Sequence, residues 1–489
     1  MTEILTARPD VLFGEGSAEL TNVQGTIRVS GRTQRYSSLA ADVWPLLATG
    51  EAYRFTFSVR SEGTPFRMAP YMKIIYSMGD REFIHYSSGA PAEIGADWTE
   101  LTIQTYFDPQ FTVSRVIVYT IQQSTEGLPD FSVRSLTMDK MECLKQDNEA
   151  TRLSPQPLTI GAIRWDAWFD VNSTLSNVSR QTAATLGPQH FHDRLPFFTK
   201  VIDENTVAYP QETQEDFDRE VQYAKKAGFA YFAYCWYHGA MNYARVLHRT
   251  SPYRDQVKMC AIIHVSGLSD DDLRELADDM AQSYYFKFDG RPLVFVFNCG
   301  TSNPEERRKL ITLAAERGLP RPYFVAMTSV DPWSQAELCC GDYDAVGAYG
   351  SSSTGPDQAY ADFAARNEAR YNGCYQLNPR YPLIPNIACG LDFRPRIEHP
   401  VSWMKGSYYV NVPTPEELYT HAYNTLKALH DHPIPGGPNS VLVYAWNEHD
   451  EGGWCCPTLA VDENGLPTGK EPNETHLLAL KKAFDQFLK

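Results

Sequence analysis

The sequence lacks the features that would place it in a membrane, on a nucleic acid or around a nucleotide cofactor. Its 489 residues contain no run of about 18 consecutive apolar residues, the length that a membrane-spanning helix needs. No Gly-x-Gly-x-x-Gly follows a strand pattern and no P-loop is present, which excludes the common nucleotide-binding sites. Lys and Arg number only 44 against 60 Asp and Glu, and the formal charge of −16 disfavours nucleic acid and anionic membranes as partners.

Cysteine is present, but its spacing builds no recognisable site. The ten cysteines include two adjacent pairs, at 339–340 and 455–456, and no Cys-x-x-Cys. We therefore expect no disulfide framework and no metal site. We also expect no cofactor and no obligate protein partner. The N-terminal MTEILTARPDVLFGEGS has no basic segment followed by an apolar one, so we expect no signal peptide in the numbered chain. The sequence is compatible with two locations of the protein: the cytoplasm, or a secreted or periplasmic location if a signal peptide has been removed.

The first 145 residues carry the pattern of an all-β domain. Short apolar or alternating runs are separated by Gly, Pro, Ser and Asp clusters, without a helical period of useful length. The expected strands are residues 26–30, 53–60, 71–76, 101–107, 115–122 and 131–138. We predict a jelly-roll-like β-sandwich over residues 1–145, followed by a polar, proline-bearing linker over residues 146–158.

Two roles are open for this sandwich. Its last expected strand, FSVRSLTMDKM, resembles the closing strand of many carbohydrate-binding modules. In the first role it binds sugar through exposed aromatics such as Tyr36, Trp44 or Tyr86. In the second it packs on the following domain and shapes its cleft. We favour the second role, because such sandwiches often keep the fold without the binding.

From residue 159 the pattern alternates between buried strands and amphipathic helices. The expected strands are residues 159–169, 229–237, 259–265, 292–298, 323–328, 345–349, 384–388 and 441–444. The expected helices include residues 215–227, 269–282, 304–317, 356–371, 414–429 and 474–488. Eight strands alternating with helices predict a (β/α)8 TIM barrel, of the α/β class, over residues 159–489. A doubly wound sheet is the alternative, which the missing nucleotide motifs disfavour.

Polar and aromatic side chains follow almost every expected barrel strand. A barrel presents its active site at the C-terminal ends of its strands, and a purely structural barrel does not need such groups there. The candidates for substrate binding are Trp165, Asp166, Trp236, Tyr237, His238, His264, Asn298, Tyr349, Asp392, Arg394, Arg396, Trp446 and Asn447. They suit the recognition of sugar hydroxyls. The tryptophans Trp165, Trp236 and Trp446 either form walls on which sugars stack or pack the top layer of the barrel.

The stretch SVLVYAWNEHDEGGW, residues 440–454, carries the strongest chemical signal. An apolar strand ends abruptly in acids, an amide and tryptophan, which suits the mouth of a barrel better than a core. Glu448 and Glu451 are three residues apart, so a turn can bring both to one side. Cleavage of a glycosidic bond needs two such carboxyl groups, one to donate a proton and one to accept a proton or attack. The alternative interpretation is a solvated acidic loop.

The two acids are expected to differ in charge. Burial of Glu451 against Trp454 should raise its pKa and keep it protonated. Glu448 should stay ionised, because a nearby amide or tyrosine donates hydrogen bonds to it and Arg394 or Arg396 supplies a positive charge.

Several separated segments resemble one family. They are GPQHFHDRLPFF and AKKAGFAYFAYCWYHG within residues 187–239, FDGRPLVFVFN at 288–298, GLDFRPR at 390–396 and AWNEHDEGG at 445–453. The last two resemble a G-W-D-N-x-P-R and a W-N-E-W-x-E-G element. Together these segments resemble the WbsX-like group related to glycoside hydrolase family 99, the endo-α-mannosidase and endo-α-mannanase family, over residues 158–489.

The resemblance implies a retaining endo-glycosidase on a (β/α)8 barrel that needs no metal. It implies that Glu448 lies near the sugar 2-hydroxyl and that Glu451 is general acid and then general base, with a 1,2-anhydro sugar between the two steps. The chain departs from the group at His449, where an aromatic residue is usual. We therefore expect a glycoside hydrolase that cleaves α-linked bonds in an oligo- or polysaccharide. The alternatives are a glycosyltransferase of polysaccharide biosynthesis and a non-catalytic sugar-binding protein.

Overall fold

The described part of the chain forms two compact units. The computed structural model describes residues 2–78, 81–89, 91–107, 112–124, 127–141, 152–168, 177–209, 213–237, 243–263, 268–297, 304–327, 343–350, 357–376, 382–404 and 408–488. One unit extends to residue 141 and the other begins at residue 152. Within these ranges, no helix combines the length and the apolar character needed to cross a bilayer.

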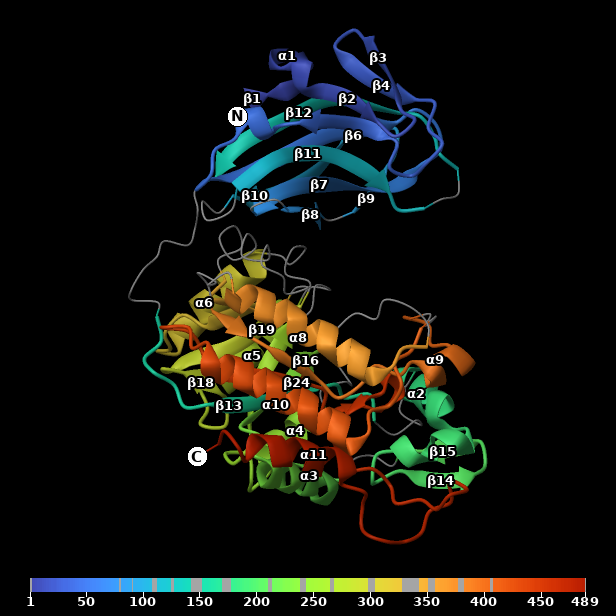
Figure 1. Cartoon of the computed structure of the whole chain (residues 1–489), viewed down its shortest axis with the longest axis vertical. Helices are drawn as coiled ribbons and strands as arrows, with labels where there is room; N and C mark the ends of the chain where they lie inside the picture. The colour runs from blue at the N-terminus through green and yellow to red at the C-terminus, as the bar shows by residue number, and fades with distance from the viewer. Residues whose placement is uncertain are drawn as a thin grey trace. The chain divides into compact units, whose positions relative to one another are not determined.

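The N-terminal unit consists of two six-stranded antiparallel sheets (Figure 1). The first has the order β10 (Thr99–Tyr106), β6 (Ala52–Ser61), β12 (Phe131–Met141), β4 (Thr26–Ser30) and β3 (Glu19–Val23), with β1 (Thr2–Glu3) paired to β12. The second has the order β2 (Leu12–Glu15), β5 (Ser38–Asp42), β11 (Thr112–Gln122), β7 (Phe66–Met78) and β8 (Arg81–Ser88), with β9 (Ala92–Ile94) paired to β7. The expectation of a β-rich N-terminal region is confirmed.

A buried arginine lies between rings that the two sheets contribute. The guanidinium carbon of Arg32 is 5.0 Å from the ring centre of Phe131 in β12 and 5.8 Å from that of Phe66 in β7. Its Nη1 donates to Gln122 Oε1 at 3.0 Å, and its Nε donates to the backbone oxygen of Ser37 at 2.9 Å. Burial lowers the pKa of Arg32 to about 10. The two sheets therefore meet around a hydrogen-bonded cation, which strand alternation does not predict.

The C-terminal unit is built on a ten-stranded sheet that is nearly closed. Its order is β22 (Leu383–Ile384), β21 (Ala345–Gly347), β20 (Tyr323–Met327), β19 (Arg291–Val296), β17 (Lys258–Ile263), β16 (Tyr231–Trp236), β13 (Thr159–Arg164), β24 (Ser440–Tyr444) and β23 (Asn386–Ala388). These strands run parallel, and β18 (Lys287–Phe288) adds an antiparallel pair to β19. The order starts at β22 and ends at β23, which are separated in sequence only by Pro385, so the sheet almost returns to its first strand.

Helices alternate with most of the parallel strands. They are α3 (Gln214–Ala227), α4 (Tyr243–Thr250), α5 (Asp270–Met280), α6 (Pro304–Glu316), α8 (Tyr360–Gln376), α10 (Pro415–Asp431) and α11 (Thr475–Phe484). Local sequence sets several of their ends: Ser269 and Thr414 each form a capping box with the acid three residues later. The α/β class is confirmed for this unit. The helix expected over residues 356–371 begins and ends four to five residues later, at Tyr360–Gln376.

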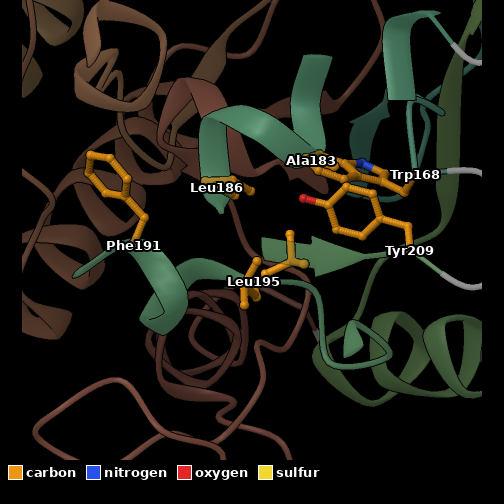
Figure 2. Packing of buried hydrophobic residues seen from close by; sticks show 7 residues of the cluster. Trp168, Ala183, Leu186, Phe191, Leu195 and Tyr209 are labelled. Carbon is orange, nitrogen blue, oxygen red and sulfur yellow. The ribbon is translucent and has the colours of Figure 1, made fainter. Parts of the chain in front are cut away.

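A segment between β13 and α3, with no counterpart in the expected elements, packs beside the sheet. It contains α2 (Asn177–Leu186), a short helix over Gln189–Arg194 and the hairpin β14 (Lys200–Asp203) and β15 (Thr206–Ala208). Figure 2 shows its buried cluster, in which Leu186, Leu195 and Tyr209 pack with Trp168. The rings of Trp168 and Tyr209 meet edge to face, with centres 5.2 Å apart. This packing fixes Trp168, which follows β13, close to the loop after β24.

Candidate active site

The chain turns back on itself directly after β24. The two-residue strand β25 (Asn447–Glu448) pairs antiparallel with β26 (Gly453–Trp454), and a single 3₁₀ turn, His449–Glu451, lies between them. Glu448 therefore ends the first strand and Glu451 ends the turn. The expected turn after the last parallel strand is present, and it carries both acids.

Two glycines bring the segments after β23 and β24 into backbone contact. Gly452 has a φ of 76°, and a Cβ built on it would lie 2.3 Å from the backbone nitrogen of Asp392. A Cβ built on Gly390 would lie 2.1 Å from the backbone oxygen of Gly452. No side chain fits at such distances. This contact explains how α9 (Arg394–Glu398), which follows β23, reaches the acids that follow β24.

Glu448 is the more deeply buried of the two acids. It is 2% exposed, and Tyr349 donates a hydrogen bond of 2.7 Å to its Oε1. Its Oε2 is buried and has no hydrogen-bond partner. Burial raises the pKa of Glu448 well above its usual value, and the nearby charge of Glu451 raises it further. Burial and the charge of Glu451 therefore both favour the protonated form of Glu448.

Glu451 lies in an ion pair. Arg396 Nη1 contacts its Oε1, and the hydroxyl of Tyr444 donates to its Oε2. Burial raises the pKa of Tyr444 well above 10, so its hydroxyl remains a proton donor in this bond. The side chain of Glu451 is 18% exposed, so it is more accessible than Glu448. Arg396 thus contacts Glu451 directly, and its charge also lowers the pKa of Glu448, although burial raises that pKa by more.

Arg396 is held by a second acid and by two tryptophans. Its Nε donates to Asp450 Oδ2 at 2.7 Å, and both side chains are fully buried. Its guanidinium carbon lies 5.5 Å from the ring centre of Trp165 and 5.7 Å from that of Trp403. Because Arg396 is buried and paired with both Asp450 and Glu451, its side chain is held in one position and stays charged.

A hydrogen bond between two predicted residues connects the segments that follow β13 and β24. The backbone nitrogen of Trp165 donates to Asn447 Oδ1 at 2.8 Å. Asp166 is 3% exposed, and Arg164 Nε donates to its Oδ1 at 2.8 Å. Burial raises the pKa of Asp166. Asp166 Oδ2 and Asn447 Nδ2 are buried without a partner, so both retain hydrogen-bonding capacity.

Two further predicted residues, Trp236 and Tyr237, lie at the end of β16. Trp236 is 1% exposed, and the guanidinium carbon of Arg245 lies 4.0 Å from its ring centre. Arg245 Nη2 also donates to the backbone oxygen of Tyr237 at 3.3 Å. Burial raises the pKa of Tyr237, and the charges of Glu448 and Glu451 contribute to the rise.

Two residues of the stretch 440–454, Trp446 and His449, are buried in packed surroundings. Trp446 has no exposed surface, and its ring centre is 5.9 Å from that of Phe229 and 5.1 Å from that of Phe232. His449 is also fully buried, and its Nδ1 donates to the backbone oxygen of Arg194 at 2.7 Å. Burial lowers the pKa of His449 to about 3, so it is neutral.

Arg394 belongs to a separate ion-pair group. Its Nε donates to both oxygens of Asp392, and Arg194 Nη2 donates to Asp392 Oδ2 at 3.0 Å. Asp392 is fully buried, so this group fixes the segment after β23. Of the two arginines expected to supply a positive charge to Glu448, Arg394 pairs with Asp392 instead.

Three predicted residues, His238, His264 and Asn298, lie outside the described residues. Within the part of the chain that is described, no group of three or more His, Cys, Asp or Glu side chains is arranged to hold a metal ion.

Sequence reasoning missed Tyr444, Asp450 and Trp403. Tyr444 is the last residue of an apolar strand and reads as core. Asp450 stands between the two glutamates and reads as part of an acidic run. Trp403 lies in the chain between α9 and α10, where no strand pattern marks the edge of the sheet. Only the contacts with Arg396 and Glu451 distinguish these residues.

Comparison with known proteins finds similarity among solved structures only. No family model and no curated protein matches the chain. It is similar to the GH99 endo-α-mannosidase from Bacteroides thetaiotaomicron, with 14% identity, coverage of 67% of this chain and 97% of that one, and a TM-score of 0.45. It is also similar to the CBM22-2 xylan-binding domain of Paenibacillus barcinonensis Xyn10C, with 15% identity, 28% and 97% coverage and a TM-score of 0.25.

A third similar structure has two modules. It is the CBM22-1–GH10 part of the Clostridium thermocellum endo-1,4-β-D-xylanase 10B, with 11% identity, 97% and 95% coverage and a TM-score of 0.32. The structural neighbours named here are thus glycoside hydrolases and carbohydrate-binding modules, at low sequence identity.

Proposed function

We propose that this chain is a retaining, endo-acting glycoside hydrolase that cleaves α-linked bonds in a polysaccharide with Glu448 and Glu451. The observation that carries the proposal is the pair itself: two interacting carboxyls, one buried with a raised pKa and one ion-paired, each bound by a tyrosine hydroxyl. Acid–base cleavage of a glycoside uses one protonated and one ionised carboxyl, and two carboxyls in unlike surroundings suit that division.

The architecture that goes with this function is also proposed. It is a closed (β/α)8 barrel over residues 159–489, preceded by a jelly-roll-like sandwich over residues 1–145 and a linker over residues 146–158. Support comes from the nearly closed parallel sheet and from the position of the acids after β24, at the carboxyl ends of the strands.

The chemistry follows from the burial of each acid. Glu448, the deeper acid, has a free Oε2 that can accept the proton of a sugar 2-hydroxyl, as the family 99 resemblance implies. The 2-oxygen then attacks the anomeric carbon while Glu451, the more exposed acid, protonates the leaving glycosidic oxygen. Water, deprotonated by Glu451, opens the resulting 1,2-anhydro sugar at the anomeric carbon, and Glu448 returns the proton to the 2-oxygen.

The first step requires a proton on Glu451 and an ionised Glu448, whereas burial and the charge of Glu451 raise the pKa of Glu448 in the free protein. We infer that substrate binding shifts the proton from one carboxyl to the other, because the total charge of the pair is the same in both forms.

The experiment that tests this function is a reaction panel. The full chain is incubated with α-mannan, dextran and pullulan, with and without nucleotide sugars. Release of reducing oligosaccharides without a donor, lost in Glu451→Gln, supports hydrolysis. Extension of the polysaccharide that depends on a donor refutes hydrolysis in favour of transfer.

A non-catalytic sugar-binding protein is the second candidate. The observation that favours it is the 2% exposure of Glu448, because a catalytic carboxyl has to reach the sugar. Binding of a polysaccharide in the same panel, with no release of oligosaccharide over long incubation, would support this candidate instead.

A further inference from the structure

An exposed tryptophan packs on Arg396, the arginine that contacts Glu451. Trp403 is 42% exposed, although large aromatic side chains normally lose most of their exposure on folding. It lies in a tight turn in which Val401 and Met404 form an isolated bridge. The backbone nitrogen of Ser402 donates to Gln181 Oε1 of α2 at 2.6 Å, which anchors the turn to the neighbouring helix. The exposure is therefore that of an anchored residue.

The ring of Trp403 is one side chain away from the reacting carboxyl. The guanidinium carbon of Arg396 lies 5.7 Å from the ring centre of Trp403, and Arg396 Nη1 contacts Glu451. The ring centre of Trp165 is 6.1 Å from that of Trp403 at an interplanar angle of 61°. Met404, next in sequence, places its sulfur 3.4 Å from Arg396 Nη1. Trp403 is thus continuous with the site through Arg396.

We propose that the exposed ring of Trp403 is a stacking subsite for a saccharide unit next to the unit that is attacked at Glu451. The proposal rests on the function proposed above and adds to it the class of substrate: a chain of several sugar units that continues past the cleaved bond. The C–H faces of a sugar are apolar and stack on aromatic rings, whereas its hydroxyls remain in water. An open tryptophan held at the edge of a polar site suits that use.

A purely structural role for Trp403 predicts a different result. In that role the ring only covers Arg396, so its loss alters the ion pair with Glu451 and lowers turnover equally for short and long substrates. A stacking subsite instead affects only substrates long enough to occupy it. Substrate length therefore separates the two roles.

The test compares three variants of the full chain. Trp403→Ala removes the ring, Trp403→Phe keeps an aromatic face, and Ile202→Ala, on the exposed hairpin strand β14, is the control for loss of a large exposed apolar side chain. Retardation by α-mannan, dextran and pullulan in native affinity gels measures binding. For a polysaccharide that is cleaved, kcat/KM is measured on its oligosaccharides of increasing length. Melting temperatures confirm that each variant is folded.

We expect Trp403→Ala to lose about tenfold in affinity and in kcat/KM for long substrates, equivalent to about 1.4 kcal/mol, with little change on the shortest cleaved substrate. Trp403→Phe should recover most of the loss, and Ile202→Ala should behave as the wild type. Equal losses on short and long substrates, or no retardation of the wild type by any of the polysaccharides, would overturn the subsite. Retardation that depends on Trp403 without hydrolysis would refute the proposed enzyme and retain the subsite.

Discussion

Tyr349 and Glu448 are joined by a hydrogen bond of 2.7 Å, although they lie 99 residues apart in the sequence. Tyr349 follows β21 and Glu448 follows β24, on opposite sides of β22 and β23 in the sheet. This bond stabilises the carboxylate form and so lowers the pKa of Glu448, whereas burial and the charge of Glu451 raise it by more. The proton affinity of the acid pair therefore depends on residues from separate parts of the chain.

Tyr349→Phe removes the donor and keeps the ring. Without the bond, the pKa of Glu448 should rise further, so the pair keeps its last proton to higher pH. We expect the descending limb of the plot of kcat/KM against pH to move upward by up to about one unit. Lower turnover with an unmoved limb would contradict this, and would mean that the hydroxyl only orients the carboxyl.

Asp450→Asn should move the same limb in the opposite direction. The negative charge of Asp450 raises the pKa of Glu448, so neutralising it lets the pair lose its last proton at lower pH. The matched control is Asp392→Asn, which neutralises another fully buried aspartate paired with arginine. We expect the limb to fall in Asp450→Asn and to stay in place in Asp392→Asn; an upward shift in the former is the outcome that this reasoning does not allow.

Glutamine at each acid should separate their roles. Glu448→Gln and Glu451→Gln should each reduce turnover of a natural glycoside by about 10²- to 10⁴-fold, because each removes one proton-transfer group. A substrate with an activated leaving group, such as a glycosyl fluoride, needs no acid for departure. Glu451→Gln should therefore recover its first step on the fluoride, whereas Glu448→Gln should not. Recovery in the reverse order would assign the acid role to Glu448.

The stability of the C-terminal unit should fall with acid because of two buried histidines. Burial lowers the pKa of His248 and of His449 to about 3, from 6.5. The contribution of the two neutral imidazoles to the free energy of unfolding is complete above pH 6.5 and is lost as the pH falls toward 3. The reason is that both histidines bind a proton in the unfolded chain at a pH where they stay neutral in the folded chain. Each histidine contributes a slope of up to about 1.4 kcal/mol per pH unit.

His449→Phe tests the contribution of one of them. The variant keeps a ring against Trp168, whose ring centre is 5.2 Å away, but it has no group to protonate. Urea unfolding at a series of acidic pH values should show a shallower fall in the free energy of unfolding than in the wild type. An unchanged slope would mean that His449 is not excluded from protonation in the folded chain.

Much of the fold follows from local sequence signals. The alternation of buried strands and capped helices predicts the α/β class, and the run of short strands predicts the β-rich N-terminal region. The seventh expected strand, residues 384–388, is an element that these local signals do not predict correctly. The sequence predicts one strand over residues 384–388, but Pro385 has no N–H to donate and divides it, so β22 pairs with β21 while β23 pairs with β24.

The sequence singles out the two acids and includes Tyr349 and Arg396 among the candidate residues, but it does not tell which acid each of them contacts. Glu448 and Glu451 stand out because they end an apolar strand. Arg394 and Arg396 are equivalent in sequence, but two residues along the helical turn α9 point in nearly opposite directions, so one pairs with Asp392 and the other with Glu451. The bond from Tyr349 depends on the order of strands in the sheet, which no local pattern encodes.

The backbone contact between Gly390 and Gly452 has a consequence for how related chains can be recognised. Any methyl group at either position would push the two loops apart and separate Arg396 from Glu451, so the charge on one loop is available to the acid on the other only while both positions stay bare. A chain that keeps the two glutamates but has a larger residue at either glycine would have the reactive groups without the cation that accompanies them. A search for proteins with this chemistry should therefore require both glycines together with the acids.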